Sequence, residues 1–134
     1  MRYQRAERPL KLDGFAAARD FFTGCLAESD PARERLFVAH LDDKLNCIHL
    51  TSHEGRETKV PLPVRSIIAD AARCGSAGIV LAHSHPSGDP RPSRSDCVAT
   101  RRLAGAADGL DCTILDHLVF AGDECTSMRR LGLL

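Results

Sequence analysis

The stretch GIVLAHSHPSGDPRPSRSD, residues 78–96, decides how the rest of the chain is interpreted. It opens with GIVLAH, a short continuous apolar run that is typical of a strand buried on both faces of a sheet. Three prolines then stiffen the loop that follows, and Ser93-x-x-Asp96 resembles a capping box with Ser93 at the N-cap. The stretch therefore predicts a buried strand, a stiff loop and the start of a helix in direct succession.

Apolar periodicity places the other elements around this stretch. Between Asp13 and Glu28 the apolar residues recur at helical steps, and Asp13 stands where a capping residue would. A hairpin followed by βαβ-type connections predicts the α/β class, with a mixed sheet and helices packed against it. We expect helices over 13–28, 63–74 and 93–108, and strands over 36–41, 45–50, 78–83, 111–121 and 125–129.

Length and composition suit one domain. The chain has 134 residues, of which 43% are hydrophobic, enough for a single core. We expect an N-terminal arm over 1–11 and one domain over 12–134. No apolar run reaches the roughly 18 residues of a membrane span, and no secretory signal is visible. The six cysteines are scattered without a C-x-x-C pair, so we expect a cytoplasmic protein with reduced thiols and no membrane partner.

The charge balance gives no whole-molecule signal for a polyanionic partner. Eighteen basic and eighteen acidic side chains give a formal net charge of zero. Proteins that bind nucleic acid or acidic membranes usually carry a basic excess or a basic patch. A local basic patch remains compatible with these numbers.

His83 and His85 are the first candidates for a metal site. In an extended backbone residues i and i+2 point to the same side, so the two imidazoles can converge just past the end of the buried strand. Imidazole suits Zn²⁺, and a catalytic zinc usually takes three protein ligands. Asp96 is the best candidate for the third. The alternative interpretation is that Ser93 and Asp96 merely cap a helix, although a cap does not need the two histidines.

The whole pattern resembles a known family. HSHPSGDP at residues 83–90, followed by Ser93 and Asp96, looks like the motif of the JAB/MPN (JAMM) metalloprotease domain, and within it the RadC-like branch. Ser84 stands where RadC-like domains usually carry asparagine, and the segment 121–124 is less glycine-rich than usual. The resemblance covers about residues 12–134, and it extends to the segments at 41–44, 115–118 and 127–134.

The resemblance implies a fold, a cofactor and an activity. The fold would be a cytidine-deaminase-like three-layer α/β/α sandwich with a mixed sheet. His83, His85 and Asp96 would bind Zn²⁺ with a water as fourth ligand, and Ser93 would donate to the oxyanion. The activity would be hydrolysis of a peptide or isopeptide bond, with a peptide or an isopeptide-linked protein as substrate.

The family also uses an upstream glutamate as general base, and Glu34 matches its position before the first strand. Glu54 and Glu57 fall in a predicted polar loop, and Glu28 ends a predicted helix. Without the resemblance, Glu34 would be interpreted as an exposed charge in the run 33–35. His117 lies in an apolar strand, and we interpret it as a sheet histidine, with contact to the site as the alternative.

Three other functions compete with the peptidase. The RadC name points to DNA repair, so binding or processing of nucleic acid is the second hypothesis, but one tyrosine and no tryptophan leave little for base stacking. A nucleotide deaminase would need H-x-E and P-C-x-x-C, which are absent. A metal-free binding domain would not need His83, His85 and Asp96 at the spacing of metal ligands. The arginines that could form a basic rim, or simply a solvated surface, are Arg91, Arg94, Arg101, Arg102, Arg129 and Arg130.

Overall fold

The computed structural model describes residues 10–55 and 61–134. Within these residues the chain forms three helices and five strands. The helices are α1 (Phe15–Ala27), α2 (Val64–Cys74) and α3 (Arg94–Asp108), and the strands are β1 (Arg35–Leu41), β2 (Cys47–Glu54), β3 (Gly78–Ser84), β4 (Thr113–Ala121) and β5 (Glu124–Ser127).

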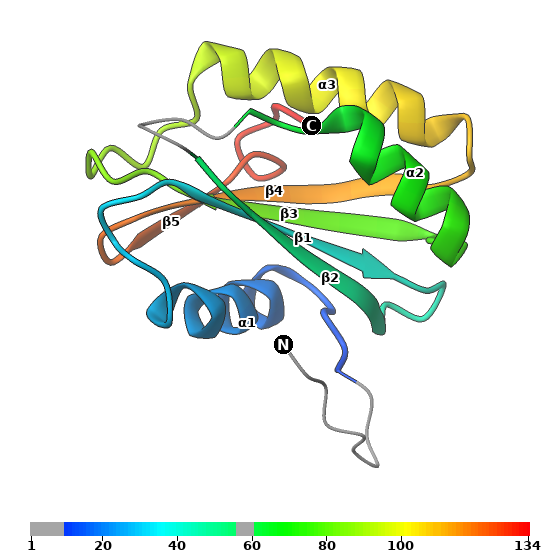
Figure 1. Cartoon of the computed structure of the whole chain (residues 1–134), viewed down its shortest axis with the longest axis horizontal. Helices are drawn as coiled ribbons and strands as arrows, with labels where there is room; N and C mark the ends of the chain where they lie inside the picture. The colour runs from blue at the N-terminus through cyan, green and yellow to red at the C-terminus, as the bar shows by residue number, and fades with distance from the viewer. Residues whose placement is uncertain (1–9, 56–60) are drawn as a thin grey trace.

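The strands form one mixed sheet in the order β2-β1-β3-β4-β5. β3 and β4 run parallel, and the other neighbours are antiparallel. α1 covers one face of the sheet, and α2 and α3 cover the other (Figure 1). The predicted α/β class, with a mixed sheet in a three-layer sandwich, is confirmed.

The central strand β3 is buried on both faces, as its apolar run predicts. Val80 and Ala82 pack in the core beneath α1, together with the fully buried Phe22. Ile79 and Leu81 point the other way, into the core beneath α2 and α3. This alternation follows from the two-residue period of a strand. It also sends His83, two residues after Leu81, toward the α2 and α3 face.

The first hairpin differs from its predicted bounds. β2 begins at Cys47 because the turn runs on to Asn46, whose amide, like that of Lys44, donates to the Asp42 carboxylate at 2.9 Å. β2 then continues to Glu54, which pairs with Arg35, so residues 53 and 54 are strand rather than loop. Polar residues suit this strand because it lies at the edge of the sheet, half open to solvent.

The start of α1 also differs from the prediction. Gly14, not Asp13, occupies the N-cap, and no side chain caps this helix, so the predicted role of Asp13 is wrong. Gly14 has a φ of 94°, a conformation that glycine adopts without steric cost. Its carbonyl accepts the first helical hydrogen bond, from the Ala18 amide at 3.1 Å.

The predicted N-terminal arm, residues 1–11, falls mostly outside the described residues. Its last two residues lie against the hairpin: the Cys47 amide donates to the Leu10 carbonyl at 2.8 Å, and Lys11 forms a β-bridge with Asn46. The end of the predicted arm is thus hydrogen-bonded to the domain.

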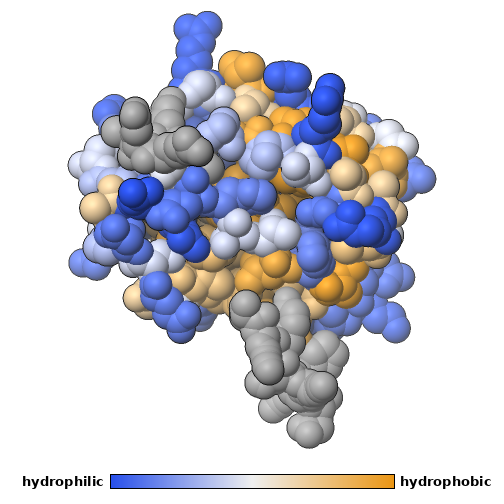
Figure 2. Space-filling view, in the orientation of Figure 1, coloured by the Kyte–Doolittle hydropathy of each residue, from blue (hydrophilic) through white to orange (hydrophobic). Residues whose placement is uncertain are grey.

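Hydrophilic side chains cover much of the face seen in Figure 2, and hydrophobic surface shows between them. Across residues 10–55 and 61–134, none of the helices combines the length and the apolar character that crossing a bilayer requires.

Leu81 offers a direct test of the core beneath α2 and α3. We expect Leu81→Ala to lower the free energy of unfolding by about 2–5 kcal/mol, because it removes a fully buried side chain and leaves a cavity. Val98→Ala, on the exposed side of α3, should cost less than about 1 kcal/mol. Urea unfolding followed by circular dichroism measures both, and equal losses would contradict this account of the core.

Candidate metal centre

β3 places the two histidines of the motif side by side. His83 lies in the strand with 3% of its surface exposed, and His85 follows after Ser84 ends it. The His85 amide still donates to the Phe120 carbonyl of β4 at 2.7 Å, so the extended pairing continues past the strand end. Both rings therefore turn to the same side, with their Nε2 atoms 2.8 Å apart.

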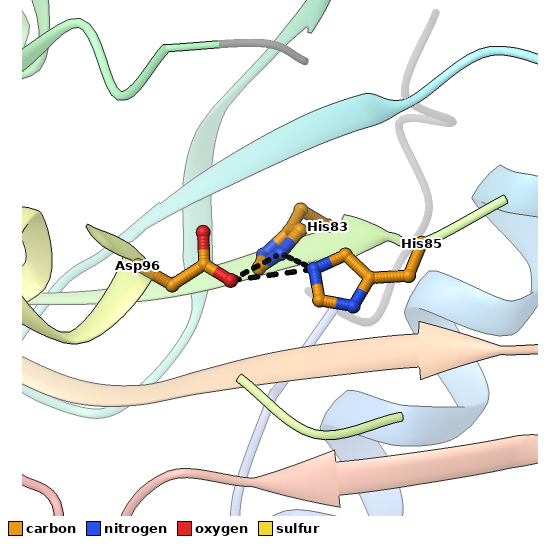
Figure 3. Close-up of side chains that lie close together, drawn as sticks. All are labelled: His83, His85 and Asp96. Atoms are coloured by element: carbon orange, nitrogen blue, oxygen red, sulfur yellow. Dashed lines mark hydrogen bonds and ion pairs between the residues drawn. The ribbon is translucent and has the colours of Figure 1, made fainter. Parts of the chain in front are cut away.

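Asp96 reaches the histidines from the start of α3. Its carboxylate oxygen Oδ2 lies 3.3 Å from Nε2 of His83 and 3.3 Å from Nε2 of His85 (Figure 3). The three side chains thus come together from a strand end and a helix start. Among the described residues, they are the group of histidines, cysteines and carboxylates that can hold a metal ion.

The capping box at the start of α3 holds this carboxylate in place. Ser93 Oγ accepts from the Asp96 amide at 3.0 Å, and Asp96 Oδ2 accepts from the Ser93 amide at 2.8 Å. The predicted cap is therefore confirmed, and the same oxygen that closes it also faces the histidines. Capping and proximity to the histidines are two consequences of one arrangement rather than alternatives.

The loop between the histidines and α3 orients the His85 ring. His85 Nδ1 lies 2.9 Å from the Asp89 carbonyl oxygen, which can only accept, so Nδ1 carries the proton. In a neutral imidazole the other nitrogen, Nε2, then presents a lone pair toward His83 and Asp96. The Asp89 carboxylate binds the Arg91 guanidinium at 2.9 Å, and this contact lowers the pKa of Asp89 to about 2.

The cluster favours an ionised Asp96. Burial alone would raise the pKa of Asp96, but contact with the His83 ring and the hydrogen bond from the Ser93 amide outweigh it. The net effect holds the pKa of this carboxyl well below its usual value. A negative oxygen and histidine nitrogens therefore share one partly buried position at neutral pH, which is an environment that attracts a cation.

His117 of β4 contacts the site. This contact is the alternative that the sequence left open to a histidine that only packs in the sheet. Its Nε2 lies 2.7 Å from Nδ1 of His83, and its Nδ1 lies 2.8 Å from the Thr100 hydroxyl. Complete burial, reinforced by the neighbouring His83, lowers the pKa of His117 well below its ordinary value. Thr100 was missed by the sequence reasoning, although its place four residues after Asp96, on the same helix face, was a usable signal.

Glu34 lies at the same end of the sheet. It directly precedes β1, and the antiparallel register that sets Leu36 opposite His83 carries Glu34 past the end of β3. Only 6% of its surface is exposed, so the interpretation as an exposed charge is wrong. Glu34 lines a cavity of about 870 Å³ that His85 and Ser93 also line. It also lines a smaller one, of about 360 Å³, with His83, Asp96 and His117.

The other glutamates considered lie elsewhere or outside the description. Glu28 is exposed at the C-cap of α1. Glu54 forms ion pairs with Arg33 and Arg35, both at 3.5 Å. Glu57 falls outside the described residues. Of the glutamates considered that fall within residues 10–55 and 61–134, Glu34 is the one that lines the cavities beside the histidines.

The arginines proposed for a basic rim do not all contribute to one surface. Arg91 is paired with Asp89. Arg129 donates to backbone carbonyls at the start of β4, and the Arg130 guanidinium lies 4.2 Å from the centre of the ring of Phe15, the first residue of α1. Arg129 and Arg130 thus make contacts within the domain, with β4 and with α1.

Comparison with known proteins places this arrangement in context. Residues 13–133 match the sequence model of the RadC-like JAB domain. The chain is 35% identical over 137 residues to the UPF0758 protein Bpet3149 of Bordetella petrii, covering 100% of this chain and 56% of that protein. It is 34% identical over 105 residues to the UPF0758 protein BAV2405 of Bordetella avium, covering 75% of this chain and 45% of that protein. The chain thus spans about half the length of these curated relatives.

The capping box can be tested separately from any activity. We expect Ser93→Ala to lower the free energy of unfolding by about 1 kcal/mol, because the Asp96 amide loses its partner. Ser93→Thr keeps a capping oxygen and should lose less. Thermal unfolding of the metal-free protein measures this, with Ser95→Ala as the neighbouring control. A Ser93→Ala variant as stable as the wild type would contradict the role assigned to the cap.

Proposed function

This chain belongs to the RadC-like JAB domain family, and from the chemistry of its His83, His85 and Asp96 cluster we propose that it is a zinc-dependent hydrolase. Its proposed reaction is the cleavage of a peptide or isopeptide bond by a metal-activated water. The single observation that carries the proposal is the convergence of two imidazole nitrogens and one carboxylate oxygen at one point. The proposal concerns this domain, which spans about half of the related proteins.

The residues present fit a zinc ion. Ligand atoms around a tetrahedral zinc with bonds of about 2.0–2.1 Å lie about 3.3 Å apart. Asp96 Oδ2 stands at 3.3 Å from each histidine Nε2, and the two nitrogens, at 2.8 Å from one another, are somewhat closer. Two histidines and one carboxylate leave a fourth position for water, the ligand count of a catalytic zinc site.

When bound, zinc lowers the pKa of a coordinated water to about 7 and polarises a carbonyl oxygen. In the proposed mechanism the Glu34 carboxylate accepts a proton from the attacking water and delivers it to the leaving amine. Its burial at the wall shared by the two cavities supports that role, because a base must lie close to both water and substrate.

Ser93 is proposed to hold the oxyanion of the tetrahedral intermediate. Its Oγ accepts from the Asp96 amide through a lone pair, so its hydroxyl proton is left for another acceptor. That acceptor is Ser95 Oγ, at 3.1 Å, or a substrate oxygen in the cavity that Ser93 lines. A single oxyanion donor contributes roughly 2.7–4 kcal/mol in other hydrolases.

The ligand and base roles predict different losses. We expect the wild type to bind about one zinc per chain and His85→Ala to lose it, because one of three ligands is gone. Glu34→Gln should keep the zinc and lower the rate of hydrolysis at least about 100-fold, since an amide cannot accept the proton of the attacking water. Zinc content by plasma mass spectrometry and cleavage of isopeptide-linked and linear peptides measure the two effects.

Matched controls separate these losses from general damage. His49→Ala removes a half-buried histidine of β2 away from the cluster, and Glu28→Gln changes an exposed carboxylate. Both should match the wild type in zinc content and hydrolysis. A wild type without zinc would contradict the proposal, and zinc without peptide cleavage but with salt-dependent DNA binding would favour the nucleic-acid function.

A further inference from the structure

A series of three hydrogen bonds, two buried and one partly buried, joins two of the proposed ligands through residues that the mechanism does not use. His83 Nδ1 contacts His117 Nε2 at 2.7 Å, and His117 Nδ1 contacts Thr100 Oγ at 2.8 Å. Thr100 Oγ then donates to the Asp96 carbonyl at 2.7 Å. This series of hydrogen bonds therefore links β3, β4 and α3, and it begins and ends at a residue of the candidate metal site.

The number of donors and acceptors on each group fixes the direction of every hydrogen bond in this series. The Asp96 carbonyl can only accept, so the single hydroxyl proton of Thr100 is committed to it. Thr100 Oγ must then accept from His117 Nδ1. A neutral imidazole carries one N–H, so His117 Nε2 accepts from His83 Nδ1.

This direction determines which nitrogen of His83 faces the metal position. With its single proton on Nδ1, a neutral His83 presents an unprotonated Nε2 to Asp96 Oδ2 and to His85. In the opposite tautomer an N–H group would point at the Asp96 carboxylate and occupy the direction that a metal needs. The hydrogen bond from the other ring nitrogen commonly sets the tautomer of a metal-binding histidine.

A β-bulge in β4 puts His117 on the correct face of the sheet. Ile79 pairs with Ile114, but the next residue, Val80, pairs with Asp116, so one residue of β4 is inserted. Ile114 packs beneath α2 and α3, and strict alternation would turn His117 toward α1. The inserted residue reverses that alternation and turns His117 toward His83.

The Asp116 carboxylate holds the bulged segment. It accepts from the His117 amide at 2.7 Å, from the Ser127 hydroxyl at 2.6 Å and from the Arg129 amide at 3.1 Å. These bonds tie the bulge to β5 and to the turn that follows it. Residues 115–117 thus contain the β-bulge, the Asp116 carboxylate that holds it and the His117 imidazole that the bulge turns toward His83.

We propose that His117 is a positioning residue for the metal site, held by the Asp116 bulge, and that it commits His83 to the Nδ1–H tautomer. The inference rests on the proposed metal function but not on the identity of the substrate. It assigns no contact between His117 and the metal or the reacting atoms.

Zinc affinity tests this role without any activity assay. We expect His117→Phe, which cannot accept from His83, to weaken zinc binding about 10- to 100-fold. His117→Gln places a carbonyl oxygen near the lost Nε2 and should restore part of that affinity. Thr100→Val leaves His117 Nδ1 without its acceptor and should weaken binding less than His117→Phe. Competition with a chromophoric chelator measures the dissociation constants, and His40→Phe, at an equally buried histidine outside the site, is the matched control.

The tautomer of His83 gives a readout that general destabilisation does not produce. In metal-free protein at about pH 8, long-range ¹H–¹⁵N correlation spectra identify the protonated ring nitrogen. We expect Nδ1–H for His83 in the wild type and in His40→Phe, and Nε2–H in His117→Phe.

Unchanged zinc affinity and an unchanged His83 tautomer in His117→Phe would overturn this inference and leave the proposed function standing. A wild type that binds no zinc would instead contradict the proposed function itself. The two failures are distinguishable because the first is seen in the variant and the second in the wild type.

Discussion

The capping box between Ser93 and Asp96 is the interaction on which the candidate site depends. It satisfies two amides at the start of α3, and in doing so it aims one carboxylate oxygen at both histidine Nε2 atoms. The loop before it, oriented through the bond between His85 and Asp89, brings that helix start back over the end of β3. Local stability and the geometry of a metal site are therefore consequences of the same two hydrogen bonds.

Much of the fold follows from patterns local to the chain. The unbroken apolar run at 78–83 predicted the buried central strand, and the capping box predicted where α3 begins. The spacing of His83, His85 and Asp96 predicted their convergence, because strand alternation and the loop after it set their directions. These signals are strong because each one depends on neighbours within about twenty residues.

Features set by pairing between distant segments were harder to predict. The contact between His117 and His83 requires a bulge in β4, and that bulge is held by Asp116 through Ser127 and Arg129. The burial of Glu34 depends likewise on the register between β1 and β3. The role assigned to Asp13 failed because Gly14, with a positive φ of 94°, occupies the N-cap, and sequence spacing does not reveal this. The first two outcomes depend on tertiary contacts rather than on local propensity, whereas the third is a local backbone conformation.

We propose that His83, His85 and Asp96 hold one metal ion through two nitrogens and one oxygen. Crystals of the protein grown with zinc, with anomalous diffraction recorded above and below the zinc absorption edge, test it most directly. We expect one anomalous peak per chain, bound by Nε2 of both histidines and by the Asp96 carboxylate at about 2.0–2.2 Å. A peak at other side chains, or none in zinc-saturated crystals, would contradict it.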